Sequence, residues 1–192
     1  MPRTPGQRAG LTHDAVIAAA REVLDERGAD GLSMRAVATR LGVAPNALYS
    51  HVAHRTALVD ALLDDRLAAL DPPPPDADPA AGLRAVMLAT YDLLADHPGL
   101  VPLYLARQGA RGPHARALGD AMLVLLARAG VTGEPAGRAV RALIVHTLGY
   151  AALATADEPT MAPPELRADV VVTLGWLIAG ILEHRPVPAA GR

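Results

Sequence analysis

The chain has 192 residues, a formal net charge of -2 and no cysteine. This length accommodates a small domain and a larger helical one, and the lack of cysteine excludes disulfides, thiolate catalysis and cysteine-ligated zinc. Residues 1–55 carry seven Arg against five acids, or +2, and the remainder carries eleven against fifteen, or -4, so positive charge is biased toward the N-terminus. Chance variation along a mixed surface would give the same modest bias.

Neither a leader nor a membrane span is expected. Arg3 and Arg8 lie near the N-terminus, but no apolar run follows them as a secretory signal would require. The uncharged apolar stretches 142–156 and 170–182 are shorter than the roughly 18 residues of a membrane helix. We expect a cytoplasmic protein with no membrane partner.

The first predicted elements are a flexible arm over 1–11 and a helix from Thr12 to about residue 27. Thr12 is placed to cap the helix, an acidic residue in its first turn favours the helix dipole, and Gly28 follows as a stop. An arm that carries Arg can enter a DNA minor groove, although tails of this kind are more often disordered.

Two short helices are predicted next, over about 33–41 and 45–52. Ser33 is placed to cap the first, Gly42 can adopt the positive φ that ends it, and Pro45 suits the first position of the second.

The second short helix has little apolar surface of its own. Leu48 and Val52 are four residues apart and point inward, whereas Asn46 and Ser50 face away from the core. A polar outer face on a short helix that needs a partner is typical of a helix-turn-helix. The alternative, an ordinary pair of packed helices, explains the two apolar residues but not an outward Tyr49 and His51.

A fourth helix is predicted over 55–70, and the proline-rich segment 71–79 breaks the helical pattern and serves as a linker. Five further helices are expected in the domain over 80–192, at the ranges 80–96, 99–107, 113–129, 134–156 and 163–184. The predicted fold class is all-α, with about nine helices.

The segment LGVAPNALYSHV, followed by Arg55 and ALVDALLDD, resembles the DNA-binding domain of the TetR family of transcriptional regulators. Upstream, the resemblance extends through THDAVIAAAREVLDERGADGLSM and covers about the first third of the chain. It implies a helix-turn-helix domain over 12–70 that includes the linker helix 55–70. Ala44 departs from the pattern, because the family often has a capping Ser or Thr there, and such a loss costs ~1 kcal/mol.

The resemblance also assigns roles by position. Asn46, Ala47 and Ser50 occupy places that usually meet base edges, and their side chains suit adenine, the thymine methyl and either base type, respectively. The remaining positions correspond to phosphate anchors, and these residues are Arg35, Tyr49, His51 and Arg55. The alternative is that these four are ordinary polar residues on the surface, and for Arg35 the two interpretations are evenly balanced.

The last two predicted helices, 134–156 and 163–184, are apolar nearly all round and must be covered on more than one side. In the family the last two helices pair with their symmetry mates, which implies a homodimer that reads a palindromic operator. A buried internal hairpin is the alternative.

The middle helices are expected to enclose a cavity for a small-molecule effector, and no metal or cofactor is expected. Pockets of this kind are mostly apolar, with a few polar groups that set orientation. The candidate lining residues are Met87, Tyr91, Tyr104, Arg107, Gln108, Met122, His146 and Tyr150. Core packing explains any one of them equally well.

These observations predict a dimeric, ligand-responsive transcriptional regulator, by family resemblance most often a repressor, that is not an enzyme. The alternative is a helical small-molecule-binding protein or enzyme with a degenerate DNA-binding head. No order of Ser, His and Asp residues and no phosphate loop supports catalysis.

Overall fold

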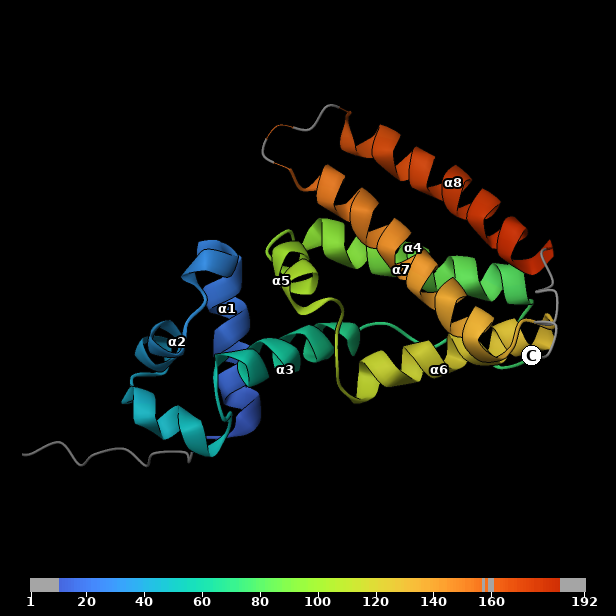
Figure 1. Ribbon diagram of the computed structural model, residues 1–192. Helices are drawn as coiled ribbons and strands as arrows, with labels where there is room; N and C mark the ends of the chain where they lie inside the picture. Colours follow the sequence, from blue (N-terminus) through green and yellow to red (C-terminus); the bar gives the residue numbers. More distant parts are fainter. Residues whose placement is uncertain (1–10, 157, 159–160, 184–192) are drawn as a thin grey trace, which may run out of the picture. The chain divides into compact units, whose positions relative to one another are not determined.

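The computed structural model describes residues 11–156, 158 and 161–183 of the chain, and the N-terminal arm therefore lies almost entirely outside the described residues. Eight α-helices and one 3-10 helix follow one another in this part, and it contains no strand (Figure 1). The all-α prediction is confirmed. The elements are α1 (His13–Gly31), α2 (Met34–Leu41), η1 (Pro45–Ser50), α3 (Arg55–Leu67), α4 (Pro79–Asp96), α5 (Leu100–Arg107), α6 (Pro113–Arg128), α7 (Gly133–Ala154) and α8 (Pro163–Glu183).

The chain forms two compact units, and the division falls inside α3, between Leu62 and Leu63. The sequence instead predicts the linker at 71–79. That proline-rich segment belongs to the second unit, where the Arg128 guanidinium donates hydrogen bonds to the carbonyl oxygens of Pro75, at 2.9 Å, and Ala77.

Local sequence signals set the helix ends of the first unit. The side chains of Thr12 and Ser33 each accept a hydrogen bond of 3.1 Å from a backbone N–H three residues later, and so cap α1 and α2. Gly28 has φ 67° and interrupts α1 at the predicted stop, while Gly42 has φ 66° and ends α2.

Residues 45–50 form a 3-10 helix, where the sequence predicted a helix over 45–52. The segment is only six residues long, and short runs readily take the tighter 3-10 geometry. Pro45 occupies the first turn, and Ala44 supplies no side-chain cap. The core of this unit is apolar throughout and includes Val16, Val23, Val37, Leu48, Leu58 and Leu62.

The second unit is a helical bundle in which α4 packs against α6, α7 and α8, α7 also packs against α8 and α6, and α5 packs against α7 (Figure 1). Asp78 caps α4 by accepting a hydrogen bond of 2.8 Å from the Ala81 N–H. Asp92 and Arg167 form a two-pronged ion pair, with both bonds at 2.8 Å, that joins α4 to α8. Within the described residues, no helix combines the length and the hydropathy needed to cross a membrane.

Candidate DNA-binding surface and ligand cavity

The 3-10 helix η1 has one buried and one exposed face. Leu48 is fully buried and Val52 nearly so, as the sequence predicted. The exposed residues are Asn46, Ala47, Tyr49 and Ser50, and 52% of the Tyr49 surface is exposed. The outward face therefore offers an amide, a methyl group, a phenol and a hydroxyl.

Two hydrogen bonds fix the chemistry at the end of η1. The Ser50 hydroxyl donates to the Ala47 carbonyl at 2.9 Å, so its oxygen faces outward as an acceptor. His51 is half-buried, and its carbonyl oxygen lies 3.2 Å from Nδ1 of His13. This contact joins the end of η1 to the start of α1.

Arg55 opens α3 and is bound to backbone of the same unit. Its Nε donates to the Leu32 carbonyl at 3.1 Å, and a terminal nitrogen lies 3.5 Å from the Ala29 carbonyl. The imidazole of His54 accepts a hydrogen bond of 3.1 Å from the Ala57 N–H and so caps α3. The sequence analysis missed both roles, since they depend on side-chain positions that spacing does not specify.

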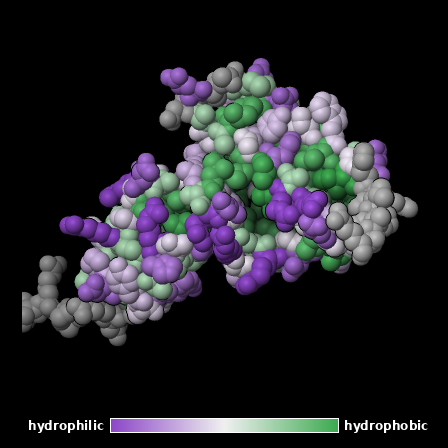
Figure 2. All heavy atoms as spheres, viewed as in Figure 1, coloured by the Kyte–Doolittle hydropathy of each residue, from purple (hydrophilic) through white to green (hydrophobic). Residues whose placement is uncertain are grey.

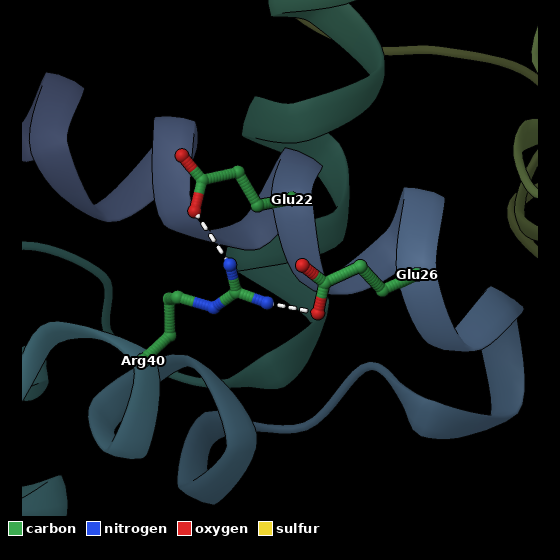
Figure 3. A network of polar contacts seen from close by, with 3 residues as sticks. All are labelled: Glu22, Glu26 and Arg40. Atoms are coloured by element: carbon green, nitrogen blue, oxygen red, sulfur yellow. Dashed lines mark hydrogen bonds and ion pairs between the residues drawn. The ribbon is translucent and has the colours of Figure 1, made fainter.

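Arg40 joins α2 to α1 through two carboxylates (Figure 3). Its guanidinium contacts Glu22 at 2.9 Å and also Glu26, and hydrogen bonding to Arg40 lowers the pKa of Glu26. All three side chains are substantially exposed, so the network adds little stability. The network joins the last turn of α2 to α1, and Arg35 near the start of α2 is exposed.

A cavity of about 550 Å³ lies within the second unit. Its walls are formed by the end of α3 together with α4, α5, α6 and α7, and most of the lining side chains are apolar. Four of the predicted effector residues line it, namely Met87, Tyr104, Gln108 and Met122.

The other four predicted effector residues lie outside the cavity lining. Tyr91 is buried in the core, and burial raises the pKa of its hydroxyl. Arg107 is half-buried at the end of α5. The rings of His146 and Tyr150 pack in a tilted arrangement with centroids 5.0 Å apart, and Nε2 of His146 lies 2.9 Å from the Thr173 hydroxyl oxygen on α8. His146 therefore belongs to the contact between α7 and α8.

Tyr104 lines the cavity, but its hydroxyl oxygen is enclosed in the protein and is not exposed to the cavity. Only 6% of this residue is exposed, and its hydroxyl has no hydrogen-bond partner in the described structure. Burial raises the pKa of the hydroxyl far above its ordinary value, and the negative charge of Asp64 raises it further. The hydroxyl therefore stays protonated and available as a donor.

Several lining residues were not predicted, and Arg141, Ile144, Val145 and Leu148 on α7 are the main group. Their helical spacing was a usable signal, because positions three and four apart share a face. The sequence analysis had assigned the apolar residues of this helix to dimer contact.

The start of α6 is capped by a side chain from α3. Asp64 is buried, and its carboxylate accepts a hydrogen bond of 2.9 Å from the Ala115 N–H and lies 2.9 Å from Nδ1 of His114. Gly112 makes room for this contact, because a Cβ there would lie 2.3 Å from the Asp64 carboxyl carbon and its φ is 143°. Ala115 and Leu67 both line the cavity, so this contact lies beside it.

Helices α7 and α8 leave large apolar side chains exposed. Trp176 is 71% exposed and Val145 67%, and Leu153 and Val172 are also exposed. A shallow groove of about 500 Å³ runs between Trp176 and residues of α7. In Figure 2, hydrophobic residues gather on the visible face of the second unit, whereas hydrophilic residues prevail on that of the first.

A comparison with protein families matches residues 16–62 to the family described as bacterial regulatory proteins, tetR family. The match contains α2, η1 and the first part of α3, and it ends where the first compact unit ends. The first compact unit therefore belongs to the TetR family.

Two curated TetR-family relatives extend the likeness beyond this domain. The tetracycline repressor protein class A from transposon 1721 of Escherichia coli is 36% identical over 149 residues, which are 72% of this chain and 65% of that protein. The HTH-type transcriptional repressor DrrR1 of Streptomyces coeruleorubidus is 31% identical over 148 residues, 76% of this chain and 54% of that one. The chain thus spans between half and two thirds of the length of these relatives.

Among solved TetR-family structures, that of a variant TetR from Acinetobacter baumannii AYE in complex with minocycline aligns with a TM-score of 0.80 at 28% identity. The alignment covers 92% of this chain and 99% of that one. The likeness therefore includes both units.

Proposed function

We propose that this chain is a dimeric, sequence-specific DNA-binding regulator of transcription, a repressor that a small molecule releases from its operator. One observation carries the proposal: α3 begins in the family-matched unit, and its last residue, Leu67, lines the cavity of the other unit. A single helix therefore links a DNA-binding head to a ligand cavity.

The exposed face of η1 is the proposed base-reading surface. The Asn46 amide can donate to and accept from one adenine, and the Ala47 methyl suits the thymine methyl. Because the Ser50 hydroxyl proton is already donated within η1, its oxygen would accept from an adenine or cytosine amino group.

Phosphate contacts are proposed for Tyr49, His51, Arg35 and Arg55. Tyr49 is a large side chain of the head that is exposed to solvent. Arg55 is held by the Leu32 carbonyl through Nε, which fixes the direction of its remaining donors. Contacts of this kind set the register of a protein on DNA without reading its sequence.

The exposed apolar face of α7 and α8 is the proposed dimer interface. Burial of Trp176, Leu153 and Val172 against a second copy would remove a large apolar area from water, at about 25 cal/mol per Å². A two-fold axis would then set two heads against half-sites one or more helical turns, roughly 34–36 Å each, apart.

Coupling between ligand and DNA follows from the position of the cavity. A ligand that contacts Leu67 differently in two positions of α3 favours one of them, and DNA affinity changes with it. The coupling is reciprocal, so operator DNA must weaken ligand binding by the same factor.

The relatives named above are transcriptional repressors, which supports a role without catalysis. A regulator of transcription acts where the bacterial chromosome lies, so the proposal places the chain in the cytoplasm. Turnover of a small molecule by the purified protein would instead favour the alternative of an enzyme with a degenerate head.

Selection of the purified full chain on a pool of random duplex DNA tests the DNA-binding role. We expect enrichment of a palindrome with two half-sites. Asn46→Ala should lose preference at one base pair, by about 1–3 kcal/mol, whereas Tyr49→Ala should weaken binding to operator and random duplex alike. The exposed α6 variant Asp120→Ala is the control and should select the same palindrome. Recovery of no motif would refute the regulator assignment.

Sedimentation equilibrium tests the interface separately. We expect a dimer for the parent chain and dissociation for Trp176→Glu, because a carboxylate would then be buried without a partner. An unchanged dimer in Trp176→Glu would show that α8 does not form the interface.

A further inference from the structure

The size and lining of the cavity fit one drug-sized organic molecule. Its volume of about 550 Å³ lies within the range of small-molecule sites, which are mostly apolar with a few polar groups. The apolar walls include Val86, Leu118, Ile144 and Leu148. A ligand must therefore present a largely hydrocarbon surface.

The charge of the lining is cationic. Among the described residues that line the cavity, Arg141 is the one with a formal charge, and no carboxylate accompanies it. The nearby Asp64 carboxylate is already engaged by backbone and imidazole groups at the start of α6. A cationic ligand would lose its water without gaining a partner, whereas an anion would be attracted by the charge of Arg141, an exposed residue of the lining.

Gly119 supports the view that this space is kept open. It lies inside α6 and lines the cavity, and a Cβ added there would meet no atom within 4 Å. An interior glycine weakens a helix relative to alanine. Neither a positive φ nor a close backbone contact requires a glycine at this position. The missing side chain instead leaves space that a ligand can occupy.

We propose that the effector is a lipophilic organic acid, with its hydrocarbon body among the apolar walls and its anionic group at Arg141. This inference rests on the proposed function, because it names the ligand class of the cavity that the regulator would use.

Two fluorescent probes with nearly the same rings test the charge preference. Anilinonaphthalene sulfonate carries an anion, and phenylnaphthylamine is its uncharged counterpart. Each is titrated into the full-length parent chain and into three variants. Arg141→Gln removes the charge, Gly119→Leu fills the cavity, and Arg116→Gln removes a charge from the exposed side of α6 and is the matched control. Circular dichroism and melting temperature establish that each variant is folded, and the smaller Gly119→Val replaces Gly119→Leu if the larger side chain prevents folding.

The expected pattern is specific. Arg141→Gln should weaken the sulfonate about fivefold, the upper range for a solvent-exposed ion pair, and change phenylnaphthylamine affinity less than about twofold on the same scale. Arg116→Gln should leave both affinities unchanged. Gly119→Leu should weaken both probes at least about tenfold, because both would need the space that the leucine fills.

Equal loss of both probes in Arg141→Gln, or no loss of either, would overturn the assignment of an acid. Unchanged binding in Gly119→Leu would place the probes elsewhere, such as on the apolar face of α7 and α8, and would also overturn it. The DNA selection is a separate readout. A selected palindrome without a charge preference among the probes supports the regulator and refutes the organic-acid effector. A charge preference without a palindrome supports an acid-binding cavity and refutes the regulator.

Discussion

Asp64 joins two helices, α3 and α6, within the second unit. It reaches from α3 to the start of α6 across 50 positions of sequence, and it satisfies a backbone N–H that helix geometry leaves without a partner. We predict that Asp64→Ala destabilises this unit strongly and that Asp64→Asn does so weakly.

The magnitude follows from the contacts. Asp64→Ala loses the hydrogen bonds of 2.9 Å with Ala115 and His114. A hydrogen bond to a charged group contributes about 1.5–3 kcal/mol, and loss of a helix cap costs about 0.5–2 kcal/mol. These estimates overlap, because one carboxylate makes both contacts, so we expect a loss of about 3 kcal/mol. Asp64→Asn keeps an oxygen for the Ala115 N–H and loses chiefly the charge near the helix dipole, which costs about 1 kcal/mol.

Urea and thermal denaturation of the full chain, followed by circular dichroism at one fixed protein concentration, measure both effects. The expected fall in melting temperature is roughly 6–12 °C for Asp64→Ala and roughly 2–4 °C for Asp64→Asn. Asp120→Ala, an exposed acid on α6, is the control and should change stability by about 0.5 kcal/mol or less. If Asp64→Ala proves no more destabilising than this control, the carboxylate does not anchor α6 and the reasoning is refuted.

Three further predictions concern single residues. Gly119→Ala should stabilise the chain by about 1 kcal/mol in urea denaturation through helix propensity, while Gly82→Ala should not, because a Cβ there would lie 2.5 Å from a core leucine; equal effects would contradict the open space at Gly119. His54→Ala should cost about 1 kcal/mol through loss of the α3 cap, and His54→Asn should restore it; equal stability of the two variants would count against the cap. Burial lowers the pKa of His146 below 6.5, so the unfolded chain binds the extra proton first and stability should fall as pH drops below about 6.5. His146→Gln should flatten that pH dependence in urea titrations, and an unchanged slope would exclude His146 as its source.

Local chemistry made the helix ends predictable. A cap such as Ser33 acts on an N–H three residues away, so one short stretch of sequence contains both partners. The burial of Leu48 and Val52 followed from their spacing for the same reason. The 3-10 geometry of η1 did not follow, because apolar spacing over six residues fits both helix types.

Contacts between distant segments lay beyond the sequence. Nothing in the residues around Asp64 indicates that it caps α6, and nothing around Arg40 indicates its two carboxylates. The cavity shows the same limit. His146 and Tyr150 share a helix face as predicted, but that face meets Thr173 on α8. Since α7 is apolar on several sides, its pattern could not show which side lines the cavity and which is left for a partner.

The cavity of the second unit lies beside the contact between Asp64 and the start of α6. This arrangement bears on how a ligand acts. Protein interiors pack as densely as organic crystals, so a cavity of about 550 Å³ with an interior Gly119 in its lining is a departure from that rule. A ligand that fills it stabilises the folded chain by mass action. Only a difference in its contacts between two arrangements of α3 can alter DNA affinity. Because α3 touches the cavity through Leu67 and holds α6 through Asp64, a change of ligand contact at that end of the cavity has to displace the helix or strain the Asp64 cap. Variants of Asp64 should therefore change the coupling between ligand and operator more than they change affinity for either one alone.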